Sequence, residues 1–193
     1  MTRFKFGARA CATIFCAAPL LQGCLSTHPE PSSGPRAQVR FVSTIGSDVV
    51  NVNVLSFTNE QCEGRKLVAE LSGIAVQNNR KKIGMPLANE FRDRDISEIH
   101  VLAGEPLVFT MGVWAGSVYS GVSTCYVTST FVPAENQMYE AMFGVGEETC
   151  GVSLQRIEKA DGGYVRVKDE SRRVLPHACT INGLENKWST DAR

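Results

Sequence analysis

Hydrophobic residues recur at every second position along most of this chain, which is the period of a β-strand. The stretch VVNVNVLSF places Val50, Val52 and Val54 on one face and Asn51 and Asn53 on the other. The same alternation predicts strands over 105–114, 125–132, 138–145 and 164–169. The 3.6-residue period of helices is nearly absent. The pattern is typical of antiparallel strands with one buried and one solvated face.

Turn residues separate these stretches at the spacing of a β-sandwich. Asp161-Gly162-Gly163 predicts a hairpin turn, and the polar stretch 88–97 has room for one helical turn. We expect eight or nine strands. The predicted fold is an all-β, disulfide-stapled antiparallel β-sandwich of the immunoglobulin or transthyretin type, over residues 37–179. A polar C-terminal tail, residues 180–193, follows it.

The first 23 residues have the organisation of a secretory signal peptide. Arg3, Lys5 and Arg9 make its start positive, and an apolar run of about eleven residues follows. That run is too short to cross a bilayer as a helix, which needs about 20 apolar residues. The alternative is a buried helix of a cytosolic protein, and Pro19 near the end of the run argues against it.

The signal segment ends in Leu21-Gln22-Gly23-Cys24, which resembles the lipobox of bacterial lipoproteins. Gln22 departs from the pattern, because a small residue is commoner there. The resemblance implies that residues 1–23 are removed and that acyl chains on Cys24 anchor the protein. Leu25 after the cysteine, where inner-membrane retention would need Asp, implies the outer membrane. Residues 24–36, rich in Ser and Pro, are then a flexible tether to a periplasmic domain.

Three further motifs are similar to a recurrent pattern in small Gram-negative envelope lipoproteins of unassigned function. They are KKIGMPL, SEIHVLAGEPLVF and CYVTSTFVPAENQMYEAMFGVGEETCGVSL, and the resemblance covers residues 39–158. It implies the fold and carries almost no information on activity.

The expected chemical state of the cysteines follows from this location. Of seven cysteines, two leave with the signal peptide and Cys24 carries lipid. Cys62, Cys125, Cys150 and Cys179 remain, an even number for an oxidising compartment, so two disulfides are expected. Three pairings are possible. We favour Cys125–Cys150, which closes a loop of about 26 residues, together with Cys62–Cys179.

Composition and motifs exclude several functions. The first 23 residues hold three of the 20 Lys and Arg and none of the 20 Asp and Glu, so the mature chain carries about −3. This charge argues against a nucleic-acid partner. His177 and Cys179 are close in sequence, but structural zinc needs four ligands and no second close pair exists, so no metal or cofactor is expected. No Gly-x-Ser-x-Gly motif is present, and no catalytic residues are predicted.

Two segments are candidate binding sites. Arg80, Lys81 and Lys82 form the most basic stretch, suited to lipid phosphates or an anionic glycan; the alternative is a solvated loop. Trp188 lies in polar company and is either an interface residue or a cap on the edge of the sandwich.

The sequence therefore predicts a non-enzymatic binding or envelope-assembly module on the outer membrane. Its membrane contact is the N-terminal lipid, and its further partner is an envelope protein or glycan. An exposed edge strand could accept a partner strand. The alternative is an envelope enzyme or enzyme inhibitor, such as a glycan hydrolase or a lysozyme-inhibitor-like protein.

Overall fold

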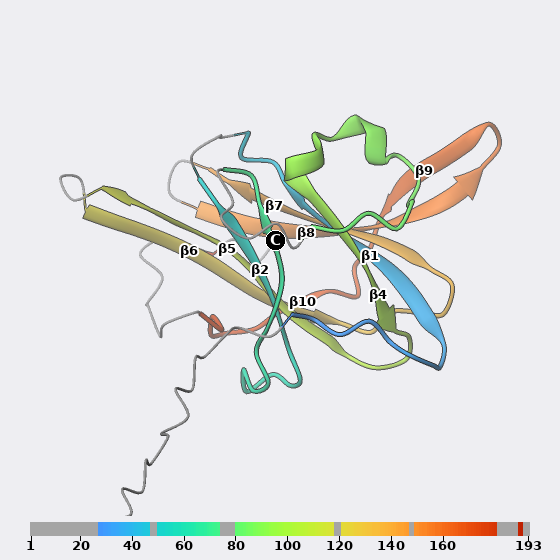
Figure 1. Cartoon of the computed structure of the whole chain (residues 1–193), viewed down its shortest axis with the longest axis horizontal. Coiled ribbons are helices and arrows are strands. Elements are labelled where there is room, and N and C mark those ends of the chain that lie inside the picture. Colours follow the sequence, from blue (N-terminus) through green and yellow to red (C-terminus); the bar gives the residue numbers. More distant parts are fainter. Residues whose placement is uncertain are drawn as a thin grey trace, which may run out of the picture.

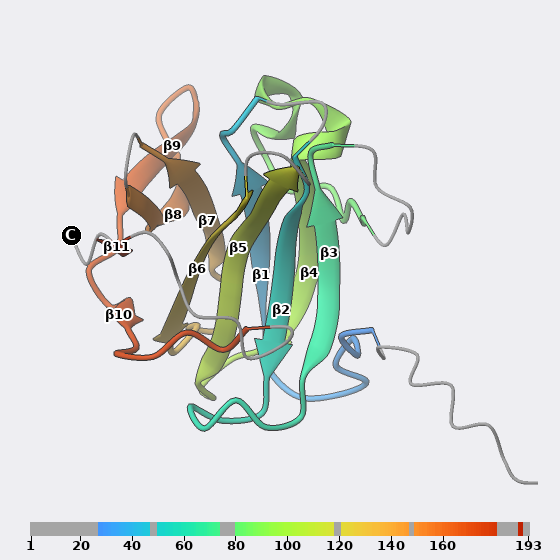
Figure 2. The same cartoon turned by 90° about the vertical axis from the view of Figure 1, so that its left-hand side faces the viewer.

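The computed structural model describes residues 27–46, 50–73, 80–117, 121–146, 149–180 and 189–190. Two β-sheets pack face to face (Figure 2). The five-stranded sheet has the order β10 (Arg173–Val174), β6 (Gly121–Phe131), β5 (Leu107–Ser117), β2 (Val52–Phe57), β3 (Lys66–Leu71). The six-stranded sheet has the order β11 (Ser189–Thr190), β8 (Thr149–Ala160), β7 (Met138–Val145), β1 (Arg36–Ser43), β4 (Ile96–Leu102), and β9 (Gly163–Lys168) also pairs with β8.

The predicted all-β sandwich is confirmed, with two differences in detail. The described residues form eleven strands, because β10 and β11 are two-residue pieces too short to leave an alternation. The central pair β1 and β7 runs parallel, within sheets that are otherwise mainly antiparallel. Alternation reports which face is buried but not the direction of a neighbouring strand, so the parallel pair could not be predicted.

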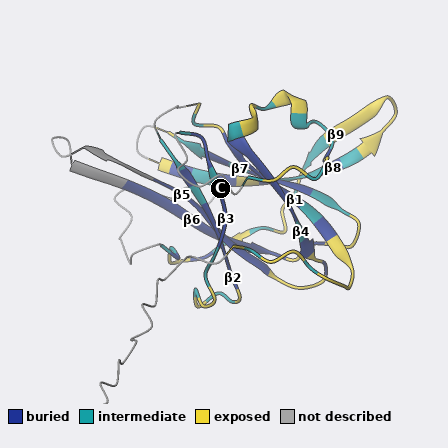
Figure 3. Cartoon of the chain, in the orientation of Figure 1, coloured by how far each residue is buried: buried dark blue, intermediate teal, exposed yellow. Residues whose placement is uncertain are grey.

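The polar stretch 88–97 contains two short 3-10 turns, η1 (Ala88–Glu90) and η2 (Asp93–Asp95). No helix among the described residues is long and apolar enough to cross a membrane. The β8–β9 hairpin turns at Asp161 and Gly162, as predicted, and its exposed tip extends beyond the sandwich (Figure 3).

The main core lies between the sheets and is built from the predicted apolar faces. Phe41 and Phe109 meet edge to face across the two sheets, with ring centroids 5.4 Å apart. Phe131 and Tyr139 extend this contact between the sheets at 4.9 Å. Such aromatic pairs stabilise a core beyond the area that they bury.

A smaller apolar cluster covers the outer face of the five-stranded sheet. It contains Leu55, Phe57, Leu67, Val108, Leu175 and Cys179, with Cys62 packed against it. The segment after β10 supplies Leu175 and Cys179 and crosses the sheet, with the Leu175 amide donating to the Thr128 carbonyl at 2.9 Å. We call this cluster the outer apolar cluster.

The outer face of the six-stranded sheet carries buried charges in place of apolar residues. Arg40 on β1 is the direct cross-strand neighbour of Glu98 on β4 and of Glu140 on β7, and all three side chains are fully buried. The guanidinium lies 2.8 Å from Glu98 and 2.9 Å from Glu140. It also donates to the carbonyls of Met85 (2.8 Å) and Pro86 (2.7 Å).

Residues 80–95, which we call the covering loop, lie over these charges (Figure 1). The second oxygen of the Glu98 carboxylate accepts hydrogen bonds from the amides of Ile83 (2.7 Å), Gly84 (3.0 Å) and Met85 (3.2 Å). The covering loop is therefore fixed by a carboxylate of the sheet below it.

The expected tether, residues 24–36, contacts the domain over its described part. Thr27 forms a bridge with Leu67 of β3, and the His28 amide donates to the Leu67 carbonyl at 2.8 Å. The His28 ring bonds the Ser56 hydroxyl at 2.8 Å, and burial lowers the pKa of His28. These contacts could not be predicted from the Ser/Pro-rich composition of the segment, because they are made by its backbone and by the ring of one histidine.

Replacement of Arg40 tests the role of the buried charges. R40M leaves Glu98 and Glu140 buried without their shared cation, so we expect a loss of about 3–5 kcal/mol in the free energy of unfolding. Urea denaturation followed by tryptophan fluorescence measures it. K168M removes a cation from an exposed pair with Glu170 and should change stability by about 0.5 kcal/mol or less. Equal effects of R40M and K168M would contradict this role.

Candidate functional site

The site residues predicted from the sequence fall into two groups. Cys24 and Trp188 lie outside the described residues. The basic stretch at 80–82 and all four cysteines expected in disulfides are described. Both favoured disulfides are confirmed: Cys125–Cys150, and Cys62–Cys179 with a sequence separation of 117.

The basic stretch lines a pocket of about 280 Å³ that is formed mainly by the covering loop. Its lining is Arg80, Lys81, Lys82, Asp93, Arg94 and Ile96. Four cations and one carboxylate thus surround one hollow, which we call the basic pocket. Arg94 was not predicted from the sequence, because it is distant from Arg80 along the chain and no local pattern joins the two.

Hydrogen bonds to β4 hold the basic stretch in place. The Lys81 amide donates to the Ser97 hydroxyl at 3.1 Å, and the Lys81 carbonyl accepts from the Glu98 amide at 2.8 Å. Lys81 also pairs with Glu30 at 3.4 Å, and Lys82 pairs with Asp93. The Lys81 and Lys82 side chains remain 49% and 42% exposed. An anion can therefore reach them, and exposed pairs of this kind are weak.

Two carboxylates that the fold brings together already have a structural partner. Glu98 and Glu140 both bind Arg40 and are fully buried. Burial alone would raise the pKa of Glu98, but hydrogen bonds from Arg40 and from the Ile83 and Met85 amides outweigh burial and lower the pKa. A glycosidase acid needs a raised pKa and an open cleft. Glu98 has neither.

Arg166 on β9 completes the charged cluster. It donates to Glu140 (2.6 Å) and to Glu90 (2.6 Å), and the Glu140 bond is the main cause of its raised pKa. The guanidinium groups of Arg40 and Arg166 also lie over the Phe91 ring, at 5.9 and 5.3 Å from its centroid. These contacts close the cluster against solvent on the β9 side.

A Ser–His pair that sequence reasoning did not find is formed by Ser56 and His28. Ser56 is buried and does not line the neighbouring hollow, a groove of about 560 Å³ to which His28, Phe57, Leu102 and Leu107 contribute. A serine nucleophile must meet its substrate, so this pair serves to hold the N-terminal segment.

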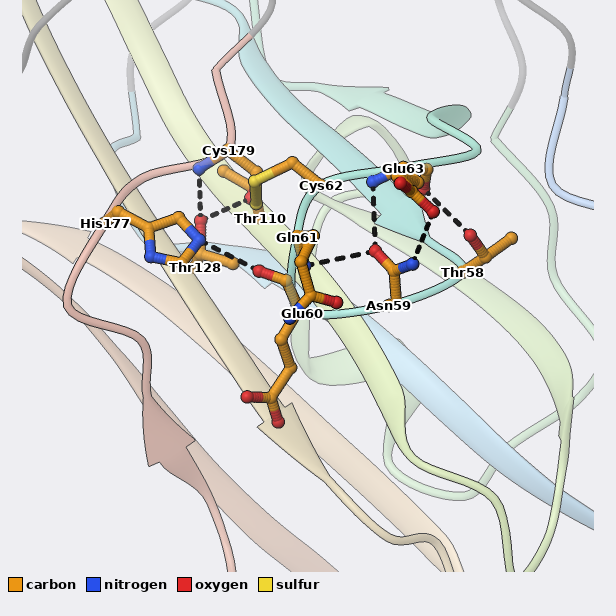
Figure 4. The surroundings of a disulfide bond; sticks show 10 residues. All are labelled: Thr58, Asn59, Glu60, Gln61, Cys62, Glu63, Thr110, Thr128, His177 and Cys179. Carbon is orange, nitrogen blue, oxygen red and sulfur yellow. Dashed lines mark hydrogen bonds between the residues drawn. A yellow bond between two sulfur atoms is a disulfide. The ribbon is translucent and has the colours of Figure 1, made fainter.

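The Cys62–Cys179 disulfide lies at the outer apolar cluster, beside His177 (Figure 4). Cys62 is half-buried, Cys179 is buried and His177 is exposed. One metal-binding atom from each of the three residues lies within 4.8 Å of the others. The sequence showed only the His177 and Cys179 half of this group, because Cys62 is distant along the chain.

The lowered pKa of Glu98 predicts a pH dependence of stability. A carboxyl whose folded pKa lies below its ordinary value of 4.5 contributes stability above pH 4.5 and loses it as the pH falls through the folded pKa. The difference in unfolding free energy between wild type and E98Q should therefore shrink on acidification. Urea denaturation at pH 7, 5, 4 and 3 measures it. E170Q, in an exposed pair, should show little difference at any pH; a constant E98Q difference would contradict the assignment.

No family model, curated protein or solved structure matches this chain.

Proposed function

We propose that the protein is an outer-membrane lipoprotein that presents its sandwich in the periplasm as a non-catalytic module binding phosphate-bearing lipid headgroups. The observation that carries this proposal is the basic pocket, where Arg94 joins Arg80, Lys81 and Lys82 around one hollow. Arginine side chains suit phosphate groups because their planar fork donates two hydrogen bonds to neighbouring oxygens.

The lipid attachment rests on the lipobox-like residues Leu21 to Cys24, and the compartment is supported by the disulfides. All four cysteines among the described residues are paired. Disulfides of this kind persist in exported proteins and are rare in the reducing cytosol. Cys125 and Cys150 join the two sheets inside the core, so this bond is part of the folded architecture.

The non-catalytic character is supported by what the described polar groups already bind. Glu98 and Glu140 neutralise Arg40, and His28 holds the buried Ser56. His100 pairs with Glu30 at 3.3 Å. The groups best placed for acid–base chemistry therefore have structural roles.

Binding to anionic vesicles tests the headgroup proposal. The chain from residue 24 with Cys24→Ser should sediment with vesicles that contain phosphatidylglycerol and much less with vesicles of phosphatidylcholine alone. Each Lys or Arg near an anionic surface contributes about 1 kcal/mol, so R80A/K81A/K82A should bind about 100-fold more weakly.

The matched control is R36A/K159A/K168A, which removes three exposed cations elsewhere on the domain and should bind nearly as wild type. Equal weakening by both triple variants would show general charge attraction. It would contradict a site at the basic pocket. Competition by free inorganic phosphate would identify the phosphate group itself as the ligand.

The intact mass of the membrane-extracted protein tests the anchor. We expect a chain that begins at Cys24 and carries acyl chains, with four further thiols that alkylate only after reduction. Cys24→Ser should abolish both acylation and membrane extraction. A chain that begins at Met1 with free thiols would contradict the proposed lipid anchor and the proposed oxidising compartment.

A further inference from the structure

We propose that Cys62, His177 and Cys179 form a redox-gated site for a thiolate-binding metal ion such as Zn²⁺. In the oxidised protein the two sulfurs are joined as a disulfide and bind no metal. After reduction, two thiolates and one imidazole face a common point. This inference goes beyond the proposed function and does not depend on it.

The ligand atoms are already within reach of one metal ion. The two sulfurs and one imidazole nitrogen lie within 4.8 Å of one another. Zinc binds sulfur at about 2.3 Å and histidine nitrogen at about 2.0–2.1 Å, so two ligands of one ion lie within about 4.6 Å of each other. The two sulfurs are bonded in the oxidised protein. After reduction they must move apart to about 3.8 Å, the separation set by two zinc–sulfur bonds of about 2.3 Å at a tetrahedral angle.

The loop that carries Cys62 is held without the disulfide. The Asn59 side-chain oxygen accepts from the amides of Gln61 (3.1 Å) and Glu63 (3.2 Å), and the Thr58 amide donates to the Glu63 carbonyl at 2.9 Å. Cys62 itself has a φ of 66°. A non-glycine residue at such an angle persists where the surrounding contacts impose it. The hydrogen bonds of Asn59 and Thr58 do not involve the disulfide, and we expect them to keep the Cys62 loop in place when the sulfur–sulfur bond opens.

The segment that carries Cys179 is also fixed independently. The Cys179 amide donates to the Thr128 hydroxyl at 2.8 Å, and that hydroxyl lies 2.7 Å from the Thr110 hydroxyl (Figure 4). The buried side chains of Leu175 and Cys179 rest on the outer apolar cluster. Reduction thus leaves Cys179 facing Cys62.

His177 has the kind of support that metal-binding histidines use. Its Nε2 lies 2.9 Å from the Glu60 carbonyl, which orients the ring. Imidazole ligands of metals are commonly oriented by a hydrogen bond that their second ring N–H donates to a backbone carbonyl. Three protein ligands on an accessible surface leave a fourth position for water or an external ligand, as in zinc sites with two cysteines and one histidine.

The second disulfide provides an internal comparison. Cys125 and Cys150 are at most 1% exposed and lie in the core between the sheets. A reducing thiolate must reach a sulfur atom to attack it. Reduction under native conditions should therefore open Cys62–Cys179 and leave Cys125–Cys150 intact.

The chemistry balances with a dithiol as the reductant. Its thiolate attacks one sulfur of Cys62–Cys179, and its second thiol resolves the mixed disulfide. Two electrons and two protons pass to the protein, giving two cysteine thiols, and the reductant leaves as its own disulfide. Binding of Zn²⁺ then releases the two thiol protons.

The test uses the chain from residue 24 with Cys24→Ser, treated with dithiothreitol without denaturant and then freed of it under argon. We expect maleimide mass labelling at Cys62 and Cys179 alone, and one Zn²⁺ bound per chain in competition with a chromophoric chelator. Co²⁺ should give a sulfur-to-metal charge-transfer band. The oxidised protein should bind neither ion.

H177A should bind Zn²⁺ at least tenfold more weakly, and H100A, which alters a histidine outside the group, should bind as wild type. Equal affinities of H177A and wild type would overturn the role of His177. Release of all four thiols together, no zinc uptake, or loss of the circular dichroism spectrum of the β-fold on reduction would overturn the site. Vesicle binding and acylation of Cys24 do not enter these readouts, so their failure leaves this result unaffected.

Discussion

The outer face of the six-stranded sheet depends on the burial of one guanidinium group. Arg40 has no access to solvent, so its charge must be neutralised and its donors satisfied inside the protein. Glu98 and Glu140 on the flanking strands neutralise it, and carbonyls of the covering loop accept its remaining donors. Removal of Arg40 leaves the buried Glu98 carboxylate without its cation, while Glu140 keeps Arg166. The sheet register, the parallel β1–β7 pair and the loop position therefore depend on one another.

The outer faces of the two sheets are covered in different ways. Each has an inner face in the shared core and an outer face that a non-strand segment covers. On the six-stranded sheet, ions and loop amides hold the covering loop, and this places the basic pocket. On the five-stranded sheet, apolar residues and the Cys62–Cys179 disulfide hold the segment after β10. Both candidate sites lie where such a segment meets its sheet, because there residues distant in sequence converge.

Alternation in the sequence was enough to predict the strands, the sandwich and the apolar faces, since period two is a local property. It could not reveal the Arg40 cluster, because an arginine between Val39 and Phe41 has the pattern of a solvated outer-face residue. The position of Arg94 in one pocket with the basic stretch, and of Cys62 beside His177, depends on loop paths, which carry no period.

The two disulfides differ in what their loss would do. In the chain-entropy account, the bond across a separation of 117 residues contributes about 4.9 kcal/mol, against about 3.5 kcal/mol for the shorter loop. Opening Cys62–Cys179 thus removes the larger constraint on the unfolded chain, while backbone amides that donate to Asn59 and Thr128 keep its two ends in place in the folded chain. A metal that binds both thiolates in the native state alone restores stability by mass action. Metal affinity and fold stability are then coupled. The disulfide and the metal site are alternative cross-links between the same two segments on the outer face of the five-stranded sheet.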